Sequence, residues 1–182
     1  MPLPLEDYAL IGDTRTAALV GKDGSVDWLC LPRFDSGACF AALLGDERAG
    51  RWVIAPAGGV LRVQRAYRRG TVVLETDFET EDGAVRIVDA MATRGRYPAL
   101  MRLVQGVRGR VPMRMQLILR FDYGSITPWV RSEDGQLRAF AGPDGVILAT
   151  DVETRGEDVD GERTTVADFT VQAGQEVPFA LA

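Results

Sequence analysis

Five Asp-Gly pairs divide the sequence into short segments, and their spacing constrains the fold more than any other feature. Asp and Gly tolerate the positive φ angles of tight hairpin turns, so each pair between strand-like segments predicts a β-hairpin. The sequence therefore indicates antiparallel β-structure. The pairs are Asp23-Gly24, Asp82-Gly83, Asp134-Gly135, Asp144-Gly145 and Asp160-Gly161.

The segments between these turns alternate apolar and polar residues. The pattern is clearest at residues 113–121 and 72–80, and residues 84–91 are predicted to pair with the latter across a turn. A period of two means that each strand turns one face toward a core. Further strands are predicted at 16–20, 26–31, 51–55, 60–67, 100–107, 137–141, 146–150, 165–171 and 177–181.

Many short strands without long helical patterns favour two packed sheets over a parallel α/β arrangement. We predict an all-β fold, a large antiparallel β-sandwich of the supersandwich-like kind, as one domain over residues 1–182. One short helical turn is expected near residues 37–44, because Asp35 and Ser36 suit an N-cap and Gly45 suits a helix end.

Composition excludes several functions. The chain has no histidine, which rules out Ser-His-Asp and Cys-His catalysis and His-ligated zinc within it. Its formal net charge of −5 argues against a nucleic-acid partner. No apolar run approaches the roughly 20 residues that span a bilayer, so no membrane partner is expected. No metal and no cofactor is expected either.

The cysteines and the chain ends indicate the compartment. Cys30 and Cys39 lie in apolar surroundings and are interpreted as reduced, buried thiols, with a disulfide as the alternative. The first nine residues carry no Lys or Arg, unlike a secretory signal, so a cytoplasmic protein is expected. Lys22 is the only Lys among many Arg, and Ala, Gly and Val are abundant, which suggests a GC-rich bacterial genome. The apolar end at residues 177–182 is interpreted as a cut, or a gene boundary, inside a longer architecture.

The most distinctive residues lie between Tyr8 and Leu44. Residues 23–44 read Asp-Gly-Ser-Val-Asp-Trp-Leu-Cys-Leu-Pro-Arg-Phe-Asp-Ser-Gly-Ala-Cys-Phe-Ala-Ala-Leu-Leu. This signature closely resembles the start of bacterial and archaeal glycoside hydrolases of family 15, the glucoamylase and trehalase type. Residues 87–91, 103–107 with Gly109, and 120–124 also resemble that family, so the resemblance covers essentially the whole chain.

The resemblance implies a trehalase-like amino-terminal β-sandwich that precedes an (α/α)6 barrel. In that family the barrel supplies two glutamates, a general acid and a general base, for inverting hydrolysis. This chain resembles only the first domain, so its expected role is noncatalytic support of a helical catalytic domain that it lacks. The substrate of the parent enzyme stays open between trehalose, maltooligosaccharide and another glucoside.

Two carboxylates of the signature are candidates for local catalysis. Inverting hydrolysis needs two carboxyl groups about 6.5–9.5 Å apart, and Asp27 and Asp35 lie near aromatic residues. However, Asp35 precedes the predicted helical turn and Asp27 lies beside a hairpin, so we interpret them as capping and turn-locking residues. No residue of the chain is predicted to be catalytic.

The corner after the second hairpin strand groups an aromatic platform, a guanidinium and a carboxylate, which suit sugar hydroxyls. These residues, Trp28, Arg33, Phe34 and Asp35, are predicted either to reach the substrate rim of the parent enzyme or to pack against its barrel. Trp28 is the one most expected in the core.

Two further readings stay open. In the first, the chain is a carbohydrate-binding module for a glucan or trehalose; Trp52 and Trp129 suggest such a role, although we interpret both as core or edge packing. In the second, it is a structural module that forms a homo-oligomer through an apolar face left bare by the missing barrel.

Overall fold

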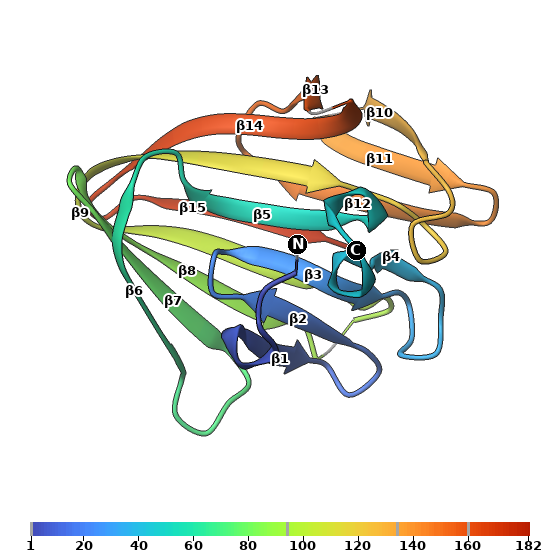
Figure 1. The fold of residues 1–182 in the computed structure, drawn as a ribbon, viewed down its shortest axis with the longest axis horizontal. Coiled ribbons are helices and arrows are strands. Elements are labelled where there is room, and N and C mark those ends of the chain that lie inside the picture. Colours follow the sequence, from blue (N-terminus) through green and yellow to red (C-terminus); the bar gives the residue numbers. More distant parts are fainter. Residues whose placement is uncertain (1, 94, 134, 160) are drawn as a thin grey trace.

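The computed structural model describes residues 2–93, 95–133, 135–159 and 161–182. Within these ranges the chain forms fifteen strands and three short 3₁₀ helices (Figure 1). All strands pair antiparallel, which confirms the predicted all-β fold. The strands are β1 (Tyr8–Gly12), β2 (Ala17–Gly21), β3 (Ser25–Cys30), β4 (Ala38–Phe40), β5 (Arg51–Pro56), β6 (Val60–Tyr67), β7 (Leu74–Thr80), β8 (Gly83–Met91), β9 (Leu100–Ile118), β10 (Trp129–Glu133), β11 (Gln136–Ala141), β12 (Asp144–Thr150), β13 (Arg155–Val159), β14 (Glu162–Gln172) and β15 (Glu176–Leu181). The helices are η1 (Leu5–Asp7), η2 (Ala42–Leu44) and η3 (Glu47–Ala49).

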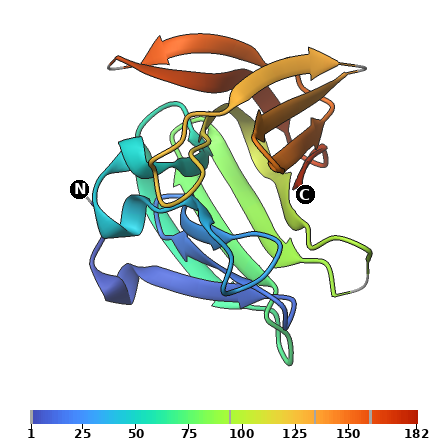
Figure 2. The ribbon, with the colours of Figure 1, turned by 90° about the vertical axis from the view of Figure 1, so that its right-hand side faces the viewer.

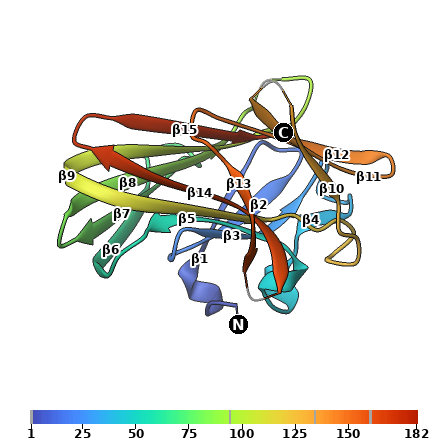
Figure 3. The ribbon, with the colours of Figure 1, turned by 90° about the horizontal axis from the view of Figure 1, so that it is seen from above.

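The longest strand, β9, belongs to both layers of the sandwich. Its first part, residues 100–109, pairs with β8 and β15, and residues 110–118 pair with β5 and β14. The strand turns back at the left-hand end of Figures 1 and 3. The prediction of two separate strands, at 100–107 and 113–121, is therefore wrong, because one strand continues through the arginine-rich bend between them.

Each layer extends outward from β9. One layer has the order β1-β2-β3-β5-β9-β14-β13, with β4 also beside β3, and the other has the order β6-β7-β8-β9-β15-β12-β11-β10. In Figure 2 the red and orange strands of both layers lie together above the blue and green ones. The edge strands are consequently β1 and β13 in one layer and β6 and β10 in the other.

Two glycines allow the bend of β9 to lie against the turn between β14 and β15. The N–H of Gly106 donates to the Gln175 carbonyl at 2.9 Å, and the N–H of Ala173 donates to the Gly109 carbonyl at 3.1 Å. A Cβ atom on Gly106 would lie 1.9 Å from the Gln172 carbonyl oxygen. Gly109 has a φ of +71°, in the left-handed region that favours glycine. The backbone thus leaves no space for side chains here.

The predicted hairpin turns are largely confirmed. The pair Asp23-Gly24 joins β2 to β3, and Asp82-Gly83 joins β7 to β8. Hairpins also form between β10 and β11 and between β13 and β14, with Gly135 and Gly161 at positive φ. Asp134 and Asp160 lie outside the described residues.

The fourth pair, Asp144-Gly145, does not form its turn. Ala141 pairs with Asp144, so Gly142 and Pro143 occupy the two turn positions and Asp144-Gly145 begins β12. The hairpin exists, but its turn lies two residues earlier than predicted. Gly142 has the positive φ of 62° that such a turn needs.

The helical turn expected at 37–44 is only partly correct. Residues 38–40 form β4, where Phe40 pairs with Leu29 and Ala38 with Cys30, and only residues 42–44 form a 3₁₀ turn before Gly45. Strand pairing along the end of β3 outweighs the local helical preference, because it satisfies backbone groups that β5 does not reach.

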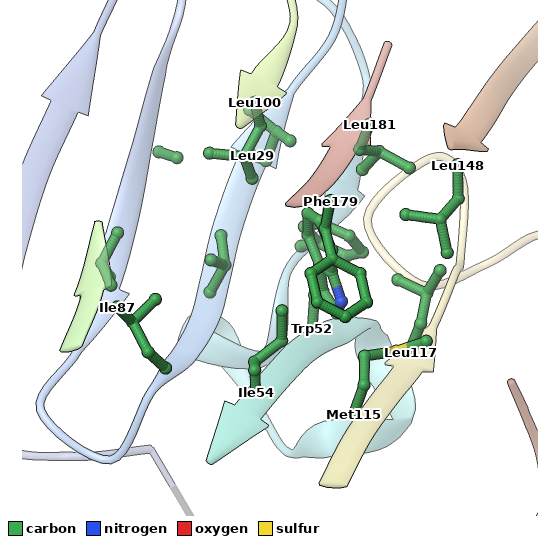
Figure 4. Close-up of a cluster of buried hydrophobic side chains, with 14 of the residues drawn as sticks. Leu29, Trp52, Ile54, Ile87, Leu100, Met115, Leu117, Leu148, Phe179 and Leu181 are labelled. Atoms are coloured by element: carbon green, nitrogen blue, oxygen red, sulfur yellow. The ribbon is translucent and has the colours of Figure 1, made fainter. Parts of the chain in front are cut away.

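The interior between the layers is apolar and continuous. Trp52 on β5 is fully buried and meets Phe179 of β15 edge to face, with ring centroids 6.3 Å apart (Figure 4). This confirms the interpretation of Trp52 as a core residue. The alternating residues of β9 and its extension also face this core as predicted: Met113, Met115, Leu117, Leu119 and Phe121.

One ion pair is buried in the same interior. Arg102 of β9 donates from Nε to Asp89 of β8 at 2.7 Å, and both side chains are at most 1% exposed. The same guanidinium crosses to the other layer, donating to the carbonyl oxygens of Trp52 at 3.1 Å and Gly24 at 2.8 Å. Arg102 therefore ties β8 and β9 to the first Asp-Gly turn.

Candidate functional site

The corner predicted from the signature follows β3 at one end of the sandwich. Three loops that are distant in sequence meet there, at residues 13–16, 31–37 and 95–99. The N–H of Phe34 donates to the Arg15 carbonyl at 2.9 Å, and Arg15 Nη2 donates to the Gly95 carbonyl at 3.0 Å. Figure 1 shows these loops at the right-hand end, away from the bend of β9.

Arg33 and Asp35 form a fork at the tip of the corner. Arg33 Nε and Nη2 donate to the two carboxylate oxygens of Asp35 at 2.9 and 2.8 Å, and both side chains are exposed. The sequence suggested that Asp35 caps a helix. Its carboxylate instead binds the guanidinium of Arg33, two residues earlier. Exposed pairs of this kind contribute little to stability, so the fork is available for an external contact.

The two aromatic residues of the corner differ in environment. Phe34 is 67% exposed. Trp28 is half-buried and packs against the small cluster of Cys30, Ala38 and Ala41, so the expectation of a core position is only partly correct. The structure thus places Arg33, Phe34 and Asp35 together in solvent and leaves Trp28 half-buried on β3.

Tyr123 completes this corner and was not among the predicted residues. Its ring lies 6.0 Å from that of Trp28, its N–H donates to the Ala38 carbonyl at 3.2 Å, and its hydroxyl donates to the Ser36 carbonyl at 3.5 Å. The residue also has a positive φ of 58°. The sequence signal that could have identified Tyr123 is its place in segment 120–124, which resembles the family.

Asp27, the other carboxylate of the signature, lies in a separate cluster. Opposite Leu19 and Val20, β3 holds the three residues 26–28, a bulge that includes Asp27. The Tyr8 hydroxyl donates to Asp27 Oδ2 at 2.7 Å, and Arg51 Nε lies 3.2 Å from Oδ1. Asp27 is buried among these groups, so it joins β1, β3 and β5.

The contribution of Tyr8 to the free energy of unfolding should depend on pH. Burial and the hydrogen bond to Asp27 raise the pKa of Tyr8 from 10.0 to about 12. The unfolded chain releases this proton near pH 10 while the folded chain still holds it, so the contribution of Tyr8 to stability falls between about pH 10 and 12. Tyr8→Phe should lower the free energy of unfolding by about 1–2 kcal/mol at pH 7, and the difference from wild type should narrow above pH 10. Urea unfolding at several pH values measures this; an unchanged difference at pH 12 would contradict it.

Both cysteines are free and buried, which agrees with their interpretation as reduced thiols. Burial raises the pKa of the Cys39 thiol far above its usual value and raises that of Cys30. Cys39 Sγ lies 3.4 Å from the Leu29 carbonyl oxygen. These thiols are protonated packing groups at neutral pH.

Among the residues that the structure describes, no group of three or more Cys, Asp or Glu side chains is arranged to hold a metal ion. The same residues contain no helix that is long and apolar enough to cross a membrane.

Comparison with known proteins accounts for the signature. The profile of the family described as "Trehalase-like, N-terminal" matches residues 1–181. The chain belongs to this family. This trehalase-like domain is 32% identical over 158 residues to the trehalase of Mycobacterium tuberculosis, covering 76% of the chain and 23% of that protein. It is 33% identical to trehalase 1 of Sulfolobus acidocaldarius, covering 84% of the chain and 26% of that protein.

The match locates the domain within its relatives. The trehalase of Thermoplasma volcanium is 29% identical, and the match covers 84% of the chain but 24% of that protein. The trehalase-like domain thus spans about a quarter of the length of the curated relatives it matches. Its residues correspond to their amino-terminal region, as the description of the family states.

Proposed function

We propose that this chain is the noncatalytic amino-terminal β-sandwich of an α-glucoside hydrolase of the family 15 type, and that it supports a helical barrel in which hydrolysis occurs. The observation that carries the proposal is the family match over residues 1–181, to a domain that makes up about a quarter of each related trehalase. The remaining three quarters of such a protein provide room for the barrel.

The state of the two candidate carboxylates supports a noncatalytic role. Asp27 is buried and held by Tyr8, Ser25 and Arg51, so it could not take a proton from water without losing these partners. Asp35 lies in solvent with both oxygens bound by Arg33. Inverting hydrolysis needs two carboxyl groups that face one substrate site, whereas Asp27 is buried and Asp35 is exposed in a different cluster. The resemblance instead assigns the acid and base to glutamates of the barrel.

The corner of Arg33, Phe34 and Asp35 is our proposed contact with that barrel. An exposed phenyl ring beside a pre-formed guanidinium–carboxylate fork resembles the apolar anchor and polar rim of protein interfaces. The loops at residues 13–16 and 95–99 brace the corner, so it would keep its shape on docking. Two roles remain within this proposal: packing against the barrel, or reaching the rim of its substrate pocket.

A hydrolysis assay tests the noncatalytic role. The purified 182-residue chain should release no glucose from trehalose, maltose or starch above a buffer control. Asp27→Asn and Asp35→Asn variants, purified in parallel, serve as controls for contaminating enzyme. Glucose release that co-purifies with the wild-type chain and is lost in either variant would overturn the proposal.

A hybrid enzyme tests the corner. The chain would replace the matching segment of the Mycolicibacterium smegmatis trehalase, to which it is 33% identical over 143 residues. Phe34→Ala in this hybrid should remove about 1 kcal/mol of buried contact and lower Tm by a few degrees, with an unchanged KM for trehalose. Leu61→Ala on β6, where Leu61 is 68% exposed, is the matched control and should change neither. A raised KM with unchanged Tm would place Phe34 at the substrate rim; no effect on either would refute the contact.

A further inference from the structure

A cleft of about 500 Å³ lies between the edges of the two layers, outside the corner. Its walls come from the start of β10, from β13 and from the start of β14, and its floor includes Leu117 of β9 and Leu137 of β11. The two hairpins that carry these strands appear in orange and red in Figures 2 and 3. Its volume lies within the range of small-molecule sites, about 300–1,000 Å³.

Trp129 lines this cleft, and its side chain is exposed to solvent. It is 82% exposed, although it begins an edge strand, so the interpretation as edge packing does not account for it. Trp52, by contrast, is fully buried. An indole offers a flat apolar face together with an N–H donor, and these are the groups that engage the C–H face and a hydroxyl of a pyranose ring.

The polar groups of the cleft suit hydroxyl ligands. Hydroxyl side chains line it on several sides. Among the described residues, the hydroxyls of Ser132, Thr154 and Thr165 donate no hydrogen bond to another residue, whereas that of Thr164 donates to the Glu162 carbonyl. Thr165 is itself buried on β14. Hydroxyl groups both donate and accept, so they can match the mixed donors and acceptors of a sugar.

The charges of the cleft favour a neutral ligand. Buried Arg120 donates from Nη2 to Glu162, and Arg155 donates to Asp168 at 2.6 Å. The hydrogen bond from Arg155 lowers the pKa of the Asp168 carboxyl, which keeps this partner ionised. Two of the three lining arginines are therefore neutralised by carboxylates, whereas an anion site would keep its guanidinium groups available.

We propose that the cleft between β10 and β13 binds a neutral saccharide, with one pyranose ring stacked on Trp129 and its hydroxyls toward Thr165 and Ser132. The residues that line this site do not include Arg33, Phe34 or Asp35 of the corner. The site goes beyond the proposed function, because binding here requires neither hydrolysis nor the helical domain. The lining residues all belong to this chain, so the chain alone should bind.

Calorimetric titration of the 182-residue chain with maltotriose and with trehalose tests the site. Binding should be detectable at millimolar saccharide and should weaken by about tenfold or more in Trp129→Ala, because stacked tryptophans dominate such contacts. Tyr97→Ala is the matched control: Tyr97 is also an exposed aromatic residue, on the loop at residues 95–99, and its loss should leave binding unchanged. Thr165→Val, which keeps the shape of the side chain, should also weaken binding.

The possible outcomes separate this site from the proposed function. Absence of heat with both saccharides, or equal affinity of wild type and Trp129→Ala, would overturn the site while leaving the hydrolysis and hybrid experiments unaffected. Glucose 6-phosphate is the charged probe. If it binds more tightly than the neutral sugars, the neutral-ligand assignment is wrong. Circular dichroism of each variant verifies that the fold is retained.

Discussion

Arg102→Met should lower the free energy of unfolding by about 3–5 kcal/mol, the largest effect expected from an exchange of one charged side chain here. The variant leaves Asp89 buried and charged without its partner. It also removes the donors to the carbonyl oxygens of Trp52 and Gly24. Urea unfolding followed by tryptophan fluorescence measures the loss.

The pair Arg86–Asp77 provides a matched control. Arg86 Nε also donates to an aspartate on the neighbouring strand at 2.7 Å, but this pair lies in partly exposed surroundings. Arg86→Met should therefore cost no more than about 1 kcal/mol. The double variant Arg102→Met/Asp89→Leu should recover part of the large loss, because no buried charge remains. Equal effects of Arg102→Met and Arg86→Met would refute the bridging role.

Gly109→Ala should destabilise the domain by about 4 kcal/mol or more, or prevent folding. Two costs combine at this position. The φ of +71° strains any L-residue, and the new Cβ would lie 2.1 Å from the Asp82 carbonyl oxygen, which is backbone and cannot rotate away. The bend of β9 that joins the two layers would have to open. Thermal and urea unfolding, together with soluble yield, measure the effect.

Gly174→Ala is the control that separates backbone strain from a steric clash of the new Cβ atom. Gly174 has a similar φ of +83°, but a Cβ atom added there would meet no other atom within 4 Å. Alanine there should cost only about 1–2 kcal/mol, the penalty of a left-handed conformation. If Gly109→Ala costs no more than Gly174→Ala, then close backbone packing does not define the bend.

The corner shows how far local sequence can predict a site. The signature grouped Arg33, Phe34 and Asp35, and the structure keeps them together because they are neighbours in one loop. The signature could not identify Tyr123, which follows β9 and reaches the corner through its hydrogen bonds to Ser36 and Ala38 and its ring contact with Trp28. Nor could it separate Asp27 from Asp35, because a bulge and the contact with Tyr8 decide where Asp27 lies.

The edge strands show a second limit. β13, with the residues Arg-Gly-Glu-Asp-Val, carries no alternating apolar pattern and was not predicted, yet all five of its residues pair with β14. The exposure of Trp129 was likewise hidden, since an aromatic residue at a strand start is equally compatible with a core. Burial at an edge depends on which strands of the other layer approach it.

The sequence by itself determined the all-β class, most of the hairpins and the family, because turn residues and two-residue periodicity act between close neighbours in the chain. Only the tertiary structure decided that residues 100–118 form one strand shared by two layers, that Phe40 lies in a strand, and that Arg102 meets Asp89 across the interior. These features depend on contacts between residues far apart in sequence, and their energies arise only when the layers close and exclude water.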